Sequence, residues 1–270
     1  MSTKKRILFI ANEMSPYVEL TDFADTINKL AVKSNDSGME VRCIMPRFGV
    51  INERRHRLHE VVRLSGINVS IDGDDYPLMI KVASLPNARL QVYFLDNEDY
   101  FKRKTVFTDE NEKWHDDNGI RAALFCKGAL ETVKKFGWPP DLIHCSGWMT
   151  GLIPMFIKTA YKKEPVFSNS KVIFTIGQNT FKEKLGADFS KLITINDHVG
   201  KKELEYFKDH NNVSMFRGGA AYADAITFGA EKVEKKLQDE FSKVKGKKTL
   251  PYNEESDLTD YLQLYSDLAK

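Results

Sequence analysis

The sequence has 270 residues, of which 42% are hydrophobic and 29% are charged, enough to bury a full core in one large domain or two small ones. Its 40 basic and 38 acidic residues give a formal net charge of +2, so nothing in the balance suggests nucleic acid or a membrane surface as a partner. The apolar run near the N-terminus, ILFIA, is too short for a signal peptide and no stretch approaches transmembrane length, so we expect a globular cytoplasmic protein.

The three cysteines argue against a disulfide framework. Cys43, Cys126 and Cys145 are odd in number, widely spaced and set among apolar residues, which predicts buried free thiols and no zinc site. Cys145 lies at the end of a predicted strand, residues 141–145, and could belong to a site, but a core position is favoured. We expect no metal and no cofactor.

The chain opens with the pattern of a strand, a helix and a second strand. Residues 6–12 (RILFIAN) form a continuous apolar run of strand length. Residues 23–33 carry apolar side chains at helical spacing, with Thr21 or Asp22 placed to cap them, and residues 39–46 (MEVRCIMP) are typical of a strand. This order predicts a parallel sheet with right-handed crossovers.

Between residues 53 and 99 short apolar runs alternate with turns, which predicts a β-rich insert beside the main sheet. The expected strands lie at residues 61–66, 67–72, 76–85 and 88–97. A helix over 120–136 should follow, capped by Asp116 or Asp117. Arg121 at its start is a candidate anion contact, although a surface or capping salt bridge is the favoured role.

Residues 138–157 (WPPDLIHCSGWMTGLIPMFI) are the centre of the expected architecture. Two prolines end the preceding helix, and DLIHC has the length and composition of a buried parallel strand. Ser146 and Gly147 supply a turn before apolar residues resume at helical spacing over 148–158. Since ligands of open α/β sheets bind at the carboxyl ends of the strands, this turn is a candidate site.

The rest of the chain continues the alternation of strands and helices. Another buried strand is expected at 171–176 with its carboxyl-end loop at 177–180, followed by a helix and strand over 215–227. An amphipathic helix over 231–245 and a last helix over 258–268 flank a polar linker at 246–254. The predicted fold class is therefore α/β, a Rossmann-like parallel sheet with helices on both faces.

The central stretch resembles a known family. PDLIHCSGWMTGLIPMF is similar to the segment P-D-[IV]-[IV]-H-x-H-D-W-x-[TA]-[GA]-L-x-P of bacterial glycogen and starch synthases, which are ADP-glucose-dependent retaining glucosyltransferases with two Rossmann-like domains in the GT-B fold. The family pattern K-[IV]-L-x-[IV]-x-x-E-x-x-P-[FY] fits Glu13, Pro16 and Tyr17. Its D-N-x-x-R motif matches the residues from Asp117 to Arg121. The resemblance covers residues 5–235 and implies the N-terminal half of such an enzyme.

Several cleft positions of the family differ in this sequence. The K-T-G-G-L core, which lets a cation and backbone N–H groups approach the donor diphosphate, is replaced by ELTDF at residues 19–23. The family's second His and Asp align with Ser146 and Gly147, and the His and Asn of T-[IV]-H-N align with Gly177 and Gln178. These substitutions predict that no catalytic residue is retained.

The resemblance also implies a domain scheme and a site. We expect a synthase N-terminal-like domain at 1–245, a linker at 246–254 and a C-terminal helix at 255–270 that packs back on the domain; the second domain of the family is not expected. The ligand-binding candidates at the crevice are Glu13, Tyr17, Arg121, His144, Ser146, Trp148, Gln178 and Asn179.

Three functions stay open at this point. The leading hypothesis is a glucan-binding or regulatory module of glycogen metabolism, inactive alone. One alternative is a glucosyltransferase that uses ADP-glucose and is completed by a full-length synthase or a chain carrying the second domain. The other is a nucleotide-binding α/β protein. The expected ligands are α-glucan or ADP-glucose.

Overall fold

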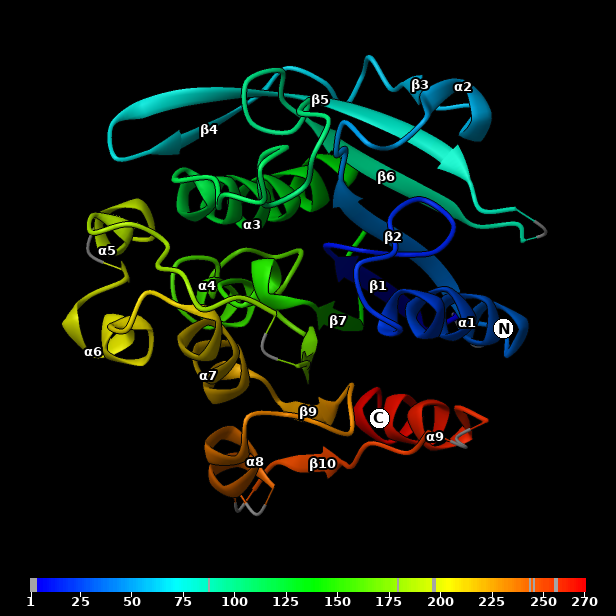
Figure 1. The fold of residues 1–270 in the computed structure, drawn as a ribbon. Coiled ribbons are helices and arrows are strands. Elements are labelled where there is room, and N and C mark those ends of the chain that lie inside the picture. The colour runs from blue at the N-terminus through cyan, green and yellow to red at the C-terminus, as the bar shows by residue number, and fades with distance from the viewer. Residues whose placement is uncertain are drawn as a thin grey trace.

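A long twisted sheet runs through the molecule, and helices cover both of its faces (Figure 1). The computed structural model describes residues 4–86, 88–178, 180–195, 198–242, 244, 246–254 and 257–270. The strands in these ranges are β1 (Arg6–Ala11), β2 (Glu40–Pro46), β3 (His59–Glu60), β4 (Ile67–Ile71), β5 (Asp74–Ser84), β6 (Gln91–Asp96), β7 (Leu142–Ser146), β8 (Lys171–Ile176), β9 (Ala225–Phe228) and β10 (Lys248–Leu250).

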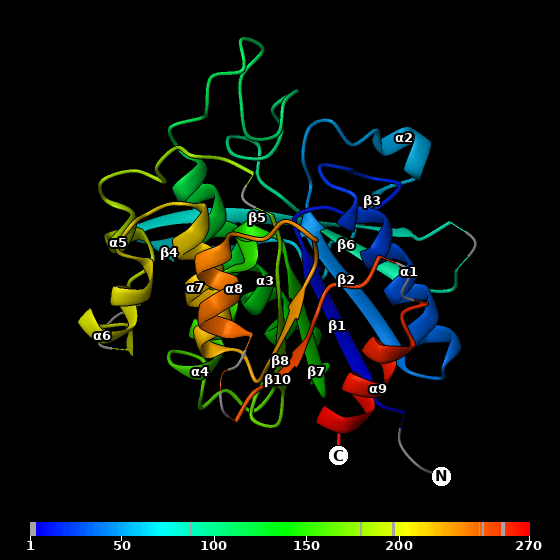
Figure 2. The ribbon, with the colours of Figure 1, turned by 60° about the horizontal axis from the view of Figure 1, so that its bottom comes forward.

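The helices are mostly crossovers between parallel strands. They are α1 (Phe23–Asp36), α2 (Glu53–His56), α3 (Asn118–Phe136), η1 (Trp148–Thr150), α4 (Ile153–Lys158), α5 (Phe189–Leu192), α6 (Lys201–Leu204), η3 (Glu205–Phe207), α7 (Asn212–Tyr222), α8 (Lys235–Phe241) and α9 (Thr259–Leu268). In Figure 2, α1 and α9 lie on one side of the sheet, and α3, α4 and α7 lie on the other.

The strand order is β10-β9-β8-β7-β1-β2-β6-β5-β3, with β4 paired to β5. Every neighbouring pair in this order from β10 to β6 is parallel. Strand β1 lies between β2 and β7, with Ile7 opposite Val41 and Leu142. Every residue of β7 is buried, because helices cover both faces of a parallel sheet. The predicted Rossmann-like α/β fold is confirmed.

The β-rich region differs from the prediction in two ways. Strand β6 pairs in parallel with β2, and β5 pairs antiparallel with β6, so these strands extend the main sheet and do not form an insert beside it. Residues 61–66 form a turn, with Val62 exposed at 78%, because the amide of Leu64 bonds back to the carbonyl of Val61. The strand predicted at 61–66 is therefore wrong.

The C-terminal region contains a strand where the sequence predicted only a linker. Strand β10 lies within residues 246–254 and pairs in parallel with β9, with Lys248 opposite Ala225. The helix expected over 231–245 is shorter in the structure, since α8 begins at Lys235. The scheme of one domain, a linker and a C-terminal helix stays a proposal.

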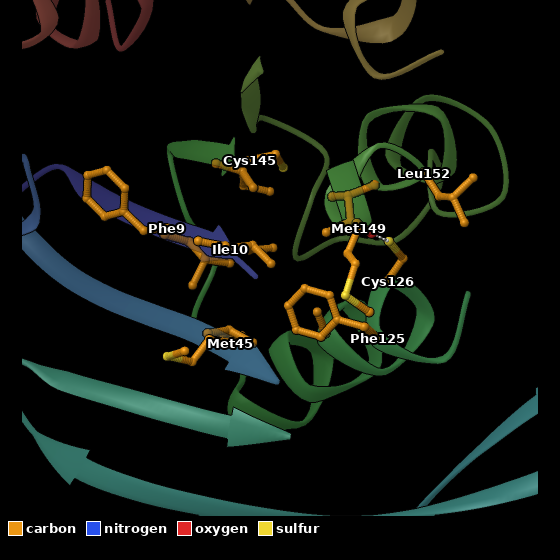
Figure 3. Packing of buried hydrophobic residues seen from close by; sticks show 14 of the residues in the cluster. Phe9, Ile10, Met45, Phe125, Cys126, Cys145, Met149 and Leu152 are labelled. Atoms are coloured by element: carbon orange, nitrogen blue, oxygen red, sulfur yellow. Dashed lines mark hydrogen bonds between the residues drawn. The ribbon is translucent and has the colours of Figure 1, made fainter. Parts of the chain in front are cut away.

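All three cysteines are buried and free, as predicted. Cys145 lies on β7 near Phe9 and Ile10 of β1, and Cys126 lies on α3 beside Met149 (Figure 3). The Cys126 thiol donates to the Met149 carbonyl at 2.8 Å, and burial raises the pKa of all three thiols. Cys145 is thus a core residue and does not line a site.

Candidate functional site

A cleft of about 830 Å³ opens at the carboxyl ends of the central parallel strands. Part of its lining consists of residues at or next to the carboxyl ends of β1, β7, β8 and β9, which we call the floor, and the rest comes from loops. The floor residues are Asn12, Glu13, Ser146, Gly147, Trp148, Thr175, Gly177, Gln178 and Gly229. This is the position at which open α/β sheets hold their ligands.

The turn after β7 depends on a glycine. Gly147 has a φ of +86°, and a Cβ atom there would lie 1.6 Å from Oδ1 of Asn12. A residue with a side chain would therefore meet both backbone strain and a collision. The close approach of Gly147 to Asn12 lets the strand turn directly into η1, which carries Trp148 into the cleft.

Glu13 ties the loop before α1 to the end of β1. Its carboxylate accepts hydrogen bonds of 2.7 Å from the backbone N–H groups of Leu20 and Thr21 and from the Thr21 hydroxyl. Burial raises the pKa of the Glu13 carboxyl, while these bonds lower it in part. The backbone N–H groups of Leu20 and Thr21 therefore already have a hydrogen-bond acceptor within the chain.

One wall of the cleft is aromatic. Trp148 and Phe181 meet edge to face with ring centroids 4.8 Å apart, and Trp114 stacks on Phe181 at 4.3 Å. Phe107 packs 5.0 Å from Trp148. We call Phe107, Trp114, Trp148 and Phe181 the aromatic wall, and all four line the cleft. Trp148 and Phe181 are buried, whereas Phe107 and Trp114 are partly exposed and offer apolar surface on which a ligand can stack.

The charged side chains of the cleft are mainly acidic. Among the described residues that line it, one is basic, Lys232, and five are acidic: Glu13, Asp22, Glu183, Glu231 and Glu254. Because like charges repel and burial strengthens that repulsion, the lining disfavours an anionic ligand.

Four of the predicted site residues line the cleft, namely Glu13, Ser146, Trp148 and Gln178. Asn179 lies outside the described residues. Three others do not line it, although all three are buried. Tyr17 instead packs its ring 5.0 Å from that of Phe94, and its hydroxyl donates to the Ser84 carbonyl at 3.4 Å.

Arg121 supports the cleft from behind. It is fully buried, and it donates to the carbonyls of Tyr100 at 2.7 Å and Val106 at 2.6 Å. Burial lowers the pKa of its guanidinium to about 10. The expected cap of α3 is absent, because the Asp117 carboxylate pairs with Arg103 instead. Arg121 thus holds the loop that carries Phe107 and Trp114, and because it is fully buried it forms no surface salt bridge.

His144 belongs to a hydrogen-bond network between the sheet and α9. Its Nδ1 lies 2.6 Å from the Tyr265 hydroxyl and its Nε2 lies 2.7 Å from Oγ1 of Thr175, which in turn lies 2.7 Å from Oγ1 of Thr227. Burial lowers the pKa of His144 to about 3, so the ring is neutral near pH 7. Tyr261 hydrogen-bonds to Thr227, so the network begins and ends on α9.

Sequence reasoning missed five of the residues that shape the cleft. Phe107, Trp114 and Phe181 come from loops with no periodic pattern, and Tyr252 and Glu254 lie in the segment predicted as a linker. A cluster of aromatic residues in loops was the available signal for the first three. No such signal marks Tyr252 or Glu254.

The part of the chain that the structure describes holds neither a metal-binding cluster nor a membrane-spanning helix. No group of three or more His, Cys, Asp or Glu side chains is arranged to hold a metal ion. None of the helices there combines the length and the apolar character needed to cross a membrane.

A parallel sheet of this order, with a cleft at the carboxyl ends of its strands, is the architecture of one Rossmann-like half of a GT-B glycosyltransferase. The sequence model of the family described as starch synthase catalytic domain matches residues 6–250. The chain therefore belongs to this family.

Individual relatives agree with this assignment. The glycogen synthase of Chlorobium limicola is 36% identical over 225 residues, which are 82% of this chain and 45% of that protein. The glycogen synthase of Chlorobaculum parvum is 31% identical, over 93% of this chain and 55% of that protein. The chain thus spans about half the length of the curated relatives it matches.

A solved structure shows the same fold. The catalytic domain of starch synthase IV from Arabidopsis thaliana, bound to ADP and acarbose, superposes with a TM-score of 0.70 at 18% sequence identity. The superposition covers 98% of this chain and 50% of that chain. At this identity the likeness supports the fold alone.

Proposed function

We propose that this chain is a glucan-binding or regulatory module of α-glucan metabolism that does not transfer glucose on its own. The observation that carries the proposal is the lining of the cleft, where an aromatic wall stands beside five carboxylates and one lysine. Apolar ring faces can stack on the faces of sugar rings, and carboxylates accept hydrogen bonds from sugar hydroxyls. A neutral oligosaccharide suits such a surface.

The same lining opposes a nucleotide sugar. Retaining transfer needs the donor diphosphate neutralised and the acceptor positioned, since electrostatic stabilisation and placement supply most of the rate enhancement. Asp22 lies in the cleft at a position that is glycine in the family pattern, and the N–H groups of Leu20 and Thr21 are bonded to Glu13. Among residues 19–23 there is therefore no basic side chain, and two of the backbone N–H groups already have an acceptor.

Titration calorimetry with maltoheptaose and with ADP-glucose tests the proposal. We expect maltoheptaose to bind, the variant Trp114→Ala to weaken that binding by roughly tenfold, and ADP-glucose to give no heat of binding. A parallel assay with labelled ADP-glucose and glycogen should show no turnover above a buffer control. Turnover that a cleft substitution such as Trp114→Ala abolishes would overturn the claim that the chain is inactive alone.

A second candidate function is a glucosyltransferase that a partner chain completes. The observation that favours it is the match of residues 6–250 to the starch synthase catalytic domain family. The test is to mix this chain with a separately expressed second half of a relative. Glucan elongation by the mixture, with neither component active alone, would favour this alternative. ADP binding without maltoheptaose binding would instead favour a nucleotide-binding protein.

A further inference from the structure

The C-terminal segment supplies one side of the cleft. Strand β10 runs parallel to β9, so its carboxyl end faces the same edge of the sheet as the cleft. The four residues after it, 251–254, are called the strap here. Tyr252 and Glu254 of the strap line the cleft together with Phe23, at the start of α1.

Tyr252 stands among carboxylates at this side. Its side chain is 37% exposed, and Glu254, Glu231 and Asp22 lie near enough to raise the pKa of its hydroxyl, in addition to the effect of burial. These residues come from three different loops, those before α1, after β9 and after β10. An exposed aromatic ring flanked by hydrogen-bond acceptors is suited to a sugar, with stacking on the ring face and donation from the sugar hydroxyls.

The helix that follows the strap is held firmly to the sheet. Tyr265 is fully buried and bonds to His144, and Tyr261 bonds to Thr227. Lys33 of α1 adds an ion pair of 3.5 Å to Asp257, just before α9. The strap is thus anchored at both ends, by the pairing of β10 with β9 and by α9.

We propose that Tyr252 and Glu254 contact the ligand of this cleft and that α9 is the clamp that holds them there. Release of α9 would free the strap and remove this side of the cleft. A ligand that touches the strap therefore favours the docked helix, and by linkage the docked helix raises affinity for the ligand by the same factor. The inference rests on the proposed function, because both concern one cleft.

The chain offers a matched control for Tyr252. Tyr206 is 36% exposed, packs 5.6 Å from Tyr222 and does not line the cleft. In calorimetry with maltoheptaose on the full chain, Tyr252→Ala should weaken binding by about tenfold and Tyr206→Ala should leave it unchanged. Melting curves establish that both variants are folded.

Tyr265→Phe tests the clamp without touching the cleft lining. Tyr265→Phe should weaken maltoheptaose binding by roughly fivefold or more, because coupling between two sites typically changes affinity by at least that factor. Hydrogen exchange in α9 of the wild type should slow on adding saturating maltoheptaose by more than exchange in the core helix α3, a difference that a merely structural role of α9 would not produce.

The outcomes separate the two proposals. This inference would be overturned, and the proposed function left standing, by either of two results. One is that Tyr252→Ala and Tyr206→Ala bind maltoheptaose with equal affinity. The other is that the wild type binds maltoheptaose while hydrogen exchange in α9 stays unaffected. No maltoheptaose binding by the wild type would overturn both.

Discussion

Replacing Tyr265 by alanine should destabilise the protein severely. The side chain is fully buried, its ring lies 6.2 Å from that of Phe9 and 5.8 Å from that of His144, and its hydroxyl bonds to His144. Truncating a buried aromatic residue to alanine costs about 3 to 5 kcal/mol. Leaving Nδ1 of His144 without its partner adds about 1 to 3 kcal/mol. The sum is large against a total stability of roughly 5 to 15 kcal/mol.

Tyr265→Phe separates the two contributions, because it keeps the ring and removes only the hydroxyl. At roughly 2 to 4 °C per kcal/mol for a protein of this size, the phenylalanine variant should melt roughly 2 to 12 °C below the wild type. Circular dichroism during heating and during urea denaturation measures both variants, with Tyr206→Phe as an exposed control. An unchanged melting temperature for Tyr265→Ala would refute the reasoning, since it would mean that α9 contributes nothing to folding.

Three further predictions concern other parts of the chain. The pKa of His144 is about 3 in the folded protein and ordinarily 6.5, so between pH 3 and 6.5 unfolding takes up a proton. The free energy of unfolding should therefore fall by about 1.4 kcal/mol per pH unit as the pH drops below 6.5. Urea denaturation of the wild type and of His144→Gln at several pH values should differ by this slope. Gly147→Ala should lower the free energy of unfolding by more than about 2 kcal/mol, because the added Cβ collides with Asn12. The control Gly66→Ala also has a positive φ, but no atom lies within 4 Å of its added Cβ. It should lower the free energy of unfolding by only about 1 to 2 kcal/mol. Truncation before Asp257 should lower the melting temperature by several degrees and promote aggregation, because it removes α9, which covers apolar surface. Sedimentation measures the aggregation. A monodisperse truncated chain with an unchanged melting curve would contradict this prediction.

The main sheet could be predicted because its strands are buried on both faces. Residues 142–146 and 171–176 are nearly continuous apolar runs, and such runs stand out in a sequence. Strand β10 could not be predicted in the same way, since Lys248 is exposed and Thr249 and Leu250 are only partly buried. The strand predicted at residues 61–66 is wrong, because apolar composition does not reveal the local turn in which the amide of Leu64 bonds to the carbonyl of Val61.

The position of the cleft was easier to predict than its details. The rule that ligands bind at strand ends predicted Glu13, Ser146 and Trp148, and all three line the cleft, while their contact with a ligand stays a prediction. It could not tell that His144, two residues before the end of β7, lies within the layers and bonds to α9. One of its partners, Tyr265, lies 121 positions later in the chain, and spacing in the sequence does not encode such a contact.

The central place of β1 in the sheet bears on how the chain folds during its synthesis. Ile7 of β1 pairs with Leu142 of β7, and the two are separated by 142 − 7 = 135 positions in the chain. At about 5 to 20 residues per second, a ribosome needs roughly 7 to 27 s to make that length. During this time the backbone N–H and C=O groups on the edge of β1 that β7 will pair with have no native partner. The nascent chain therefore presents an unpaired strand that a chaperone bound near the ribosome is well placed to protect.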